Sequence, residues 1–397
     1  MTLLERFLKY VSFDTQADPD STTYPSTMKQ HALADALVEE LHDLGIANAY
    51  KDEFCNVYAK VEGSINKSIG FIAHMDTATE MSDQDVKPLI FENYDGEDLH
   101  LPFGVDILTK DFPFLKTFKN DTIVTTSGDT LLGADDKAGI AIIMDLLAKR
   151  LESKKPFPTI YVAFTPDEEI GGGTDHFNVD YFKVDFAYTL DGSSIGEMNY
   201  ENFNAAKAVV EIAGNSIHPG EAYQRLINSQ EVAWEFHNAL PHDLRPEYTK
   251  DHEGFFHLTN MEGEVQKTTL KYIIRDHDLT KFQEKKALIN TIKDQLNAKY
   301  QQELIKITIK DQYFNMAELI KPHPEILELP TKALKDYGID LKFVPIRGGT
   351  DGAMLSYKGI LCPNLGTGSG NHHGRFEYLC VQDFEKMIEI VLEIIRK

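Results

Sequence analysis

Five short stretches of the sequence bring together acidic and histidine side chains near the ends of apolar segments. They are HMDT (74–77), GADDKAG (133–139), PDEE (166–169), LDG (190–192) and NHHGRFE (371–377). Each stretch alone is a weak signal, because acids at a helix start and Asp-Gly turns are common. Together they concentrate carboxylates and imidazoles whose burial is costly unless a cation neutralises them.

A pair of divalent metal ions would supply that charge. In hydrolytic sites two such ions lie ~3.5–4 Å apart and share a bridging carboxylate. Each ion takes about four nitrogen or oxygen ligands and leaves one position to water. One His, Asp, Glu, Asp and His satisfy both ions if one acid is shared. Such a site would also explain why Asp135 and Asp136, which repel each other, stand side by side. The pattern predicts a two-metal site.

The elements that must position these residues follow an α/β pattern up to about residue 205. Apolar runs predict buried strands at Ile69–Ala73, Thr159–Thr165 and Phe186–Leu190, and helical periodicity predicts helices at Lys29–Leu44 and Gly139–Arg150. This alternation is typical of an open, mostly parallel sheet with helices on both faces. Ligands bind such sheets at the carboxyl ends of the strands, and each run is followed there by His, Asp or Glu.

The pattern changes between residues 206 and 314. Strands are predicted at Lys207–Ala213, Gly254–Met261, Val265–Asp276 and Glu303–Lys310, and helices at Ala222–Ala239 and Leu279–Tyr300. The order β-α-β-β-α-β is that of a ferredoxin-like α+β domain. We therefore predict a catalytic domain formed by residues 1–205 and 315–397, interrupted by an inserted lid domain of residues 206–314.

Composition limits the possible classes of partner. The 397-residue chain has 42% hydrophobic and 26% charged residues, which is typical of a globular protein with more than one core. Its net charge of −23 argues against binding nucleic acid or anionic membranes. We find no apolar run of ~18 residues and no signal-peptide pattern at the start, and the three cysteines lack a C-x-x-C pair. These features favour a cytoplasmic protein.

The motifs resemble those of the peptidase T family of tripeptide aminopeptidases. HMDT and ADDK occur throughout the surrounding superfamily of two-zinc peptidases and deacylases, which includes succinyl-diaminopimelate desuccinylase. FTPDEE, ENFNAA, YIIRD and PIRGGTDGA are more particular to peptidase T, and the resemblance runs essentially from end to end. It implies a homodimer formed through the inserted domain, with two Zn²⁺ per subunit that Co²⁺ or Mn²⁺ could replace.

The resemblance also implies a role for each residue of the metal site. The implied ligands are His74 and Asp191 for one ion, Glu169 and His373 for the other, and Asp135 as the bridge, with a cis peptide bond after it. Asp76 would fix the His74 ring by a hydrogen bond, and Glu168 would be the general base. His372 competes with His373, but the family has its ligand immediately before the glycine, which selects His373.

Three further residues are candidates for binding the substrate. By the same resemblance, His218 would reach a neighbouring active site and stabilise the oxyanion; the plainer reading is a turn histidine before a proline. Arg347 stands in a Gly-rich loop and is suited to a bidentate grip on a peptide carboxylate. Arg275 could do the same, or could merely pair with Asp276.

The predicted activity is hydrolysis of the N-terminal residue from tripeptides by a metal-activated water. Alternatives within the superfamily are a dipeptidase, a carboxypeptidase or an N-acyl amino acid deacylase, which HMDT and PDEE do not distinguish. A metal-binding protein without catalysis would be expected to lack the base, whereas Glu168 is present. A phosphate-binding protein is disfavoured, because the Gly-rich tracts Gly171–Gly173 and Gly366–Gly370 lack the lysine and serine of a P-loop.

Overall fold

The computed structural model of the chain describes residues 1–396 and divides into two compact units. The first unit contains residues 1–200, 318–344 and the chain from Thr350 onward. The second unit contains residues 201–317 and the short segment Pro345–Gly349. The second unit is thus longer at both ends than the predicted insertion of residues 206–314, and it takes in a segment that the sequence assigns to the other domain.

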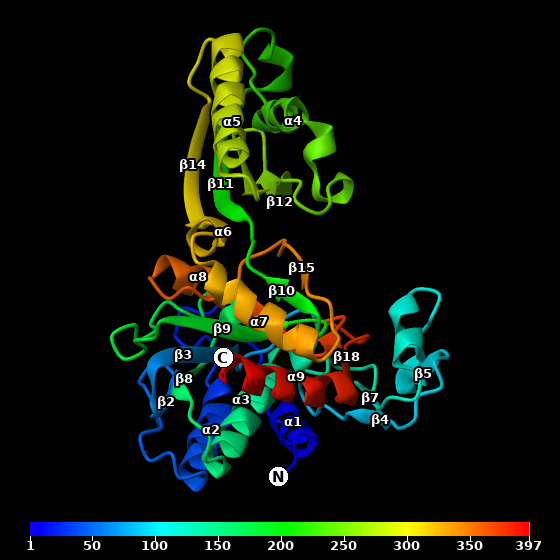
Figure 1. Cartoon of the computed structure of the whole chain (residues 1–397). Helices are drawn as coiled ribbons and strands as arrows, with labels where there is room; N and C mark the ends of the chain where they lie inside the picture. Colours follow the sequence, from blue (N-terminus) through cyan, green and yellow to red (C-terminus); the bar gives the residue numbers. More distant parts are fainter. Residues whose placement is uncertain (397) are drawn as a thin grey trace. The chain divides into compact units, whose positions relative to one another are not determined.

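The main sheet of the first unit has eight strands within residues 1–396 (Figure 1). In spatial order they are β1 (Tyr50–Lys51), β2 (Val57–Val61), β8 (Pro158–Thr165), β3 (Ile65–His74), β9 (Phe186–Gly192), β16 (Asn364–Gly366), β10 (Glu197–Asn199) and β15 (Lys342–Phe343). The central strands β8, β3, β9 and β16 are parallel, and antiparallel ladders join β2 to β8 and β10 to β16. The predicted mostly parallel sheet is confirmed.

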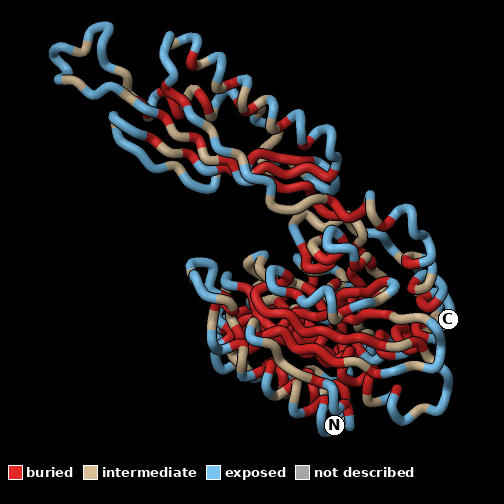
Figure 2. The backbone as a smooth tube through the Cα atoms, turned by 90° about the vertical axis from the view of Figure 1, so that its left-hand side faces the viewer, coloured by how far each residue is buried: buried red, intermediate tan, exposed pale blue. Residues whose placement is uncertain are grey.

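Helices cover both faces of this sheet because its strands are apolar on both faces. In β3, Ile69 and Phe71 face one core, which also contains α3, while Ile72 faces a second core with Tyr161 and Phe182. The helices of this unit are α1 (Leu3–Val11), α2 (Gln30–Asp43), α3 (Ala134–Glu152), α7 (Pro324–Asp336), α8 (Asp351–Tyr357) and α9 (Val381–Ile394), with the short α6 (Ala317–Ile320) at the unit boundary. Figure 2 shows the buried residues concentrated in the central strands.

A smaller sheet in the first unit was not predicted from the sequence. Its strands are, in spatial order, β17 (Ser369–Gly370), β18 (Tyr378–Cys380), β7 (Ile123–Thr125) and β4 (Leu89–Phe91), and a separate hairpin joins β5 (Leu99–Leu101) to β6 (Val105–Ile107). The ladder between β18 and β7 is antiparallel. It brings the loop between β17 and β18, which carries the NHHG motif, close to the segment that leads from β7 into α3.

The second unit has the predicted β-α-β-β-α-β order. Its elements are β11 (Asn204–Ala213), α4 (Ser229–Ala239), β12 (Phe255–Gly263), β13 (Lys267–Asp276), α5 (Leu279–Tyr300) and β14 (Ile305–Tyr313). The antiparallel sheet has the order β12-β13-β11-β14, and both helices pack against it through one hydrophobic core. Helix α4 begins later than the predicted Ala222, because Asn228 caps it by accepting the N–H of Gln230.

None of the helices described between residues 1 and 396 combines the length and the apolarity that a bilayer-spanning helix requires.

Candidate metal centre

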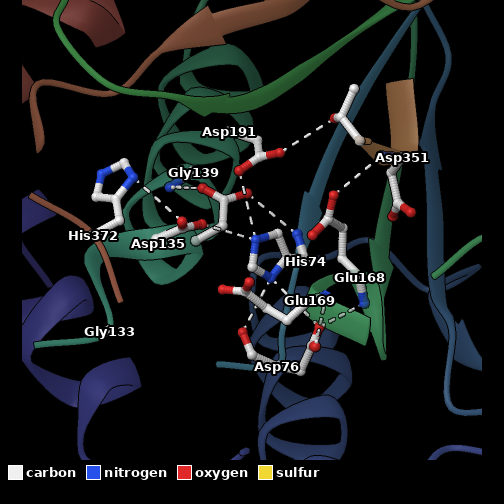
Figure 3. A network of polar contacts seen from close by, with 12 residues as sticks. His74, Asp76, Gly133, Asp135, Gly139, Glu168, Glu169, Asp191, Asp351 and His372 are labelled. Carbon is white, nitrogen blue, oxygen red and sulfur yellow. Dashed lines mark hydrogen bonds and ion pairs between the residues drawn. The ribbon is translucent and has the colours of Figure 1, made fainter. Parts of the chain in front are cut away.

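Three neighbouring parallel strands deliver acidic and imidazole groups to one edge of the main sheet. His74 is the last residue of β3, Glu168 and Glu169 lie in the turn that follows β8, and Asp191 lies near the end of β9. The carboxyl ends of parallel strands meet at the same edge, so these side chains converge (Figure 3). This is the arrangement that the positions of the motifs predict.

Asp135 enters the same place from the start of α3. Its Oδ1 lies 2.9 Å from His74 Nε2, and its Oδ2 lies 3.3 Å from His373 Nε2 and 3.3 Å from His372 Nδ1. The peptide bond between Asp135 and Asp136 is cis, as the family resemblance implies. The two carboxylate oxygens of Asp135 therefore face histidines on opposite sides, which is the geometry expected of a bridging ligand (Figure 3).

The structure also bears on the choice between the adjacent histidines. His373 Nε2 lies 3.1 Å from Glu169 Oε2 as well as 3.3 Å from Asp135 Oδ2, so its ring faces both carboxylates. His372 turns its Nε2 away to the hydroxyl of Ser369, at 2.9 Å. This geometry favours His373 as the ligand and leaves His372 as a hydrogen-bond partner of Asp135.

Two overlapping groups of side chains bring potential ligand atoms within 4.8 Å of one another. One group is His74, Asp135 and Glu169, and the other is His74, Asp136 and Asp191. The donor set consists of imidazole nitrogens and carboxylate oxygens, which suits zinc, cobalt or manganese. Glu169 Oε1 is buried and has no hydrogen-bond partner within the described chain, which is costly unless a cation binds it. The residues present therefore fit a metal centre.

The electrostatics of the site show the same need for positive charge. Burial, together with the charge of Asp191, raises the pKa of Glu168 well above its usual value. Burial and the nearby Asp135 raise the pKa of Glu169 to about 7. The carboxylates of Asp135 and Glu169 in turn raise the pKa of the His373 imidazole to about 11. These carboxylates crowd one another in a buried place, a situation that divalent cations relieve.

Asp76 does more than the predicted hydrogen bond to the His74 ring. His74 Nδ1 is nearest to the backbone oxygen of Asp76, at 3.0 Å, and lies 3.4 Å from the carboxylate Oδ1. The carboxylate accepts the backbone N–H groups of Glu168, at 3.0 Å, and Glu169, at 3.1 Å. Asp76 therefore orients the ring through its main chain and fixes the acid pair through its side chain.

Asp136 supports the site from within α3. Its Oδ2 accepts the backbone N–H of His74 at 3.2 Å, and its Oδ1 accepts that of Gly139 at 3.1 Å. The first contact connects the start of α3 to the end of β3, and the second fixes the first turn of α3 itself. Gly139 admits no side chain here, because a Cβ would meet the Leu190 backbone oxygen at 2.1 Å.

Two further acids lie beside these residues, although no role was predicted for either from the sequence. Asp351 accepts the Thr165 hydroxyl at 2.7 Å, and its backbone N–H donates to Glu168 Oε1 at 3.3 Å. Glu377 is fully enclosed and accepts backbone N–H groups from the turn that leads into α3. Asp351 lies in the motif IRGGTDG, and Glu377 lies in the motif NHHGRFE. Neither the residue type nor the spacing of these two acids distinguished them from ordinary acidic residues in loops.

The three predicted substrate-binding residues all lie in the second unit. His218 is exposed, and its Nδ1 accepts the backbone N–H of Gly220 at 3.1 Å, as in a turn before a helix. Arg275 is buried, donates to the backbone oxygens of Ala206 and Ile274, and lies over the ring of Tyr313. Asp276, the alternative partner of Arg275, pairs with Lys285 instead, at 2.6 Å.

Arg347 is the most constrained of the three. Its Nη1 donates to the backbone oxygens of Asp251 and Glu253, and its Nη2 donates to the backbone and hydroxyl oxygens of Thr249. The guanidinium also lies near the rings of Phe203 and Phe255. A bidentate grip on a peptide carboxylate would require the segment 249–253 to release these nitrogens.

The fold and the clustered candidate ligands are those of a metal-dependent hydrolase, and the sequence identifies the family. Residues 130–397 match the peptidase family M20/M25/M40, and the chain belongs to this family. It is 49% identical over 401 residues to peptidase T of Alkaliphilus oremlandii (strain OhILAs), with 99% of this chain and 98% of the relative covered. The predicted membership of the peptidase T family is thereby confirmed.

Solved structures share the fold at low sequence identity. The crystal structure of aminopeptidase PepT from Bacillus cereus ATCC 10987 has a TM-score of 0.79 and 19% identity, with 99% of this chain and 97% of that chain covered. A Bacillus subtilis protein, described as a dinuclear metal binding peptidase from the M20 family, has a TM-score of 0.66 and 13% identity. The match covers 99% of this chain and 96% of that chain.

Proposed function

We propose that the chain is a two-metal aminopeptidase that removes the N-terminal residue from tripeptides. The observation that carries the proposal is the position of Asp135, whose two carboxylate oxygens face His74 on one side and His373 on the other. The full-length similarity to peptidase T gives the reaction, since that relative is aligned over 98% of its length.

The contacts in the site support the ligand assignment that the family resemblance implies. The residues that would hold the ions are His74 and Asp191 on one side, Glu169 and His373 on the other, and Asp135 between them. When bound, two Zn²⁺, or Co²⁺ or Mn²⁺ in their place, would lower the pKa of a water and polarise the scissile carbonyl.

Glu168 is the residue suited to move the proton. It lies beside the ligands without belonging to either ligand group, and Asp76 and Asp351 fix it through its backbone N–H and its Oε1. Burial raises the pKa of Glu168, which brings a carboxylate closer to the range in which a general base both accepts and returns a proton. It takes the proton of the attacking water and hands it to the departing amine.

The second unit supplies the proposed substrate-binding groups. His218 would stabilise the oxyanion of a neighbouring subunit's site, and Arg347 or Arg275 would hold the peptide carboxylate. We assign this unit the roles of lid and homodimer contact, and we place the enzyme in the cytoplasm. The composition supports the last point, because the charge of −23 disfavours membranes and nucleic acid, and all three cysteines are free.

A peptide panel tests the proposed reaction. The metal-loaded protein should hydrolyse Leu-Gly-Gly much faster than Leu-Gly, and it should release no leucine from N-acetyl-leucine. The Glu168→Ala variant, loaded with metal in the same way, serves as the control for contaminating peptidases. Faster turnover of Leu-Gly would instead identify a dipeptidase, and release of leucine from N-acetyl-leucine would identify a deacylase.

A further inference from the structure

Glu377 is a buried carboxylate that accepts three backbone N–H groups from the start of α3 and the turn before it. It is 1% exposed and lies immediately before β18. Its Oε2 accepts the N–H groups of Leu132, at 2.7 Å, and Gly133, at 2.9 Å. Its Oε1 accepts the N–H of Asp135 at 3.1 Å. One side chain thus satisfies three main-chain donors more than 240 residues away in the sequence.

These donors need an acceptor that the turn itself does not offer. Gly133 precedes α3, has no side chain that could accept these N–H groups and adopts a left-handed backbone with φ of 79°. Asp135 and Asp136 have non-helical backbone angles, so the regular part of α3 begins only after them. Buried main-chain N–H groups outside regular structure need an acceptor from elsewhere in the chain. Glu377 supplies this acceptor and fixes the backbone of Asp135 itself.

The same residue belongs to the loop that carries His373. The N–H of Glu377 donates to the Gly374 backbone oxygen at 3.2 Å, and Asn371 closes the loop by donating to the Phe376 backbone oxygen at 3.1 Å. The loop that bears one ligand and the turn that bears the shared ligand are therefore joined by a single carboxylate.

We propose that Glu377 is a positioning residue that holds Asp135 and His373 at the separation the metal centre needs, and so sets the affinity for metal. The inference deepens the proposed function and rests on it, because Asp135 and His373 are ligands only if the site is a metal centre. Glu377 itself is not a ligand, since both of its oxygens are occupied by backbone donors.

The chemistry of the contact selects a carboxylate. All three groups that touch Glu377 through its side chain are donors, and an ionised carboxylate offers acceptor sites only. A glutamine keeps one oxygen and would direct its NH₂ group at the remaining N–H, which leaves buried donors facing each other. An aspartate keeps the charge but is one methylene shorter and would not reach the turn at these distances.

The test compares Glu377→Gln with Glu385→Gln, an exposed glutamate of α9 that undergoes the same change in charge. Zinc affinity is measured by competition with a chelator, and amide hydrogen exchange at Leu132, Gly133 and Asp135 is measured in the metal-free protein. We expect Glu377→Gln to lose about 10–100-fold in zinc affinity and to exchange these amides faster. Glu385→Gln should match the wild type in both measurements.

The second variant, Glu377→Asp, covers the case in which the glutamine variant does not fold. It should also exchange the three amides faster and bind zinc more weakly. The inference would be overturned if a folded Glu377 variant exchanged these amides faster but bound zinc with wild-type affinity. The hydrogen bonds of Glu377 to the turn would then be purely structural. Unchanged exchange would overturn it as well. If the wild-type protein itself binds no zinc, the proposed function fails. The exchange data would still show whether Glu377 holds the backbone N–H groups of Leu132, Gly133 and Asp135.

Discussion

Asp76 Oδ1 accepts the backbone N–H of Glu168 at 3.0 Å, across the ends of two neighbouring strands. The other oxygen of the same carboxylate accepts the N–H of Glu169 at 3.1 Å. One side chain after β3 therefore sets the main chain of both acids after β8. The fixed backbone separates the roles of the two acids. Glu169 turns its carboxylate toward His373, while Glu168 stays beside the proposed ligands.

Replacing Asp76 by asparagine should lower activity without abolishing the fold. The amide oxygen of Asn can keep one of the two backbone contacts, but the NH₂ group would face the other N–H. We expect kcat to fall about 10–100-fold with little change in KM. Steady-state kinetics on Leu-Gly-Gly measure this, with the exposed Asp85→Asn as control. An unchanged kcat in Asp76→Asn would show that the contact does not position the acids.

The acids of the pair should respond differently to the same substitution. Glu168→Gln removes the base and should lower kcat about 10²–10⁴-fold, while the zinc content after dialysis stays at the wild-type level. Glu169→Gln should lose zinc, because Glu169 faces His373 at 3.1 Å and has a buried oxygen without a partner. Elemental analysis and kinetics on both variants decide the matter. Equal loss of metal in the two variants would contradict the assignment.

Asp167 should stabilise the turn that bears these acids. Its carboxylate accepts the Ser26 hydroxyl at 2.5 Å and N–H at 2.6 Å, and the Gln30 amide at 2.6 Å. Removing the hydroxyl in Ser26→Ala should cost about 1–3 kcal/mol, because one bond to a buried charge is lost. Urea unfolding measures it, and Thr22→Ala, at an exposed position nearby, is the control. Equal stability of the two variants would refute the prediction.

His277 should make the stability depend on pH. Burial, with the charge of nearby His252, lowers the pKa of His277 from 6.5 to about 4. Between pH 6.5 and 4 the unfolded chain therefore binds a proton that the folded chain does not, so stability falls as the pH falls through this window. The contribution is about 1–3 kcal/mol after allowance for solvent screening.

Urea unfolding across that window checks the sign. The stability of His277→Gln should decline less steeply from pH 6.5 to 4 than that of the wild type. His242→Gln, at an exposed histidine, should follow the wild type. Parallel pH curves for His277→Gln and the wild type would mean that His277 does not remain neutral in the folded state.

The sequence predicted the strands that carry the site but not the contacts that hold it. Strands β3, β8 and β9 are apolar on both faces and have His, Asp or Glu at or near their carboxyl ends. The local pattern therefore indicated the motifs HMDT, PDEE and LDG, whereas the family resemblance was needed to single out His74, Glu169 and Asp191 as ligands. The sheet that contains β7 and β18 is made of short strands, whose periodicity is too brief to detect. Glu377 could not be recognised for a related reason, since its partners lie more than 240 residues away.

The helix boundaries show a similar limit. Helix α4 was predicted from Ala222, but it begins at Ser229 after the Asn228 cap. The intervening segment instead forms turns, and an isolated bridge pairs Asn215 with Ile227. The composition of residues 222–228 is compatible with a helix. The bridge between Asn215 and Ile227 instead holds this segment in a non-helical conformation.

The most direct test of the account is anomalous X-ray diffraction from crystals grown with zinc. We predict two zinc peaks ~3.5–4 Å apart, with the Asp135 carboxylate between them, one peak beside His74 and the other beside His373. A single peak, or two peaks with Asp135 outside coordinating distance of either, would contradict the central claim that Asp135 bridges a dinuclear centre.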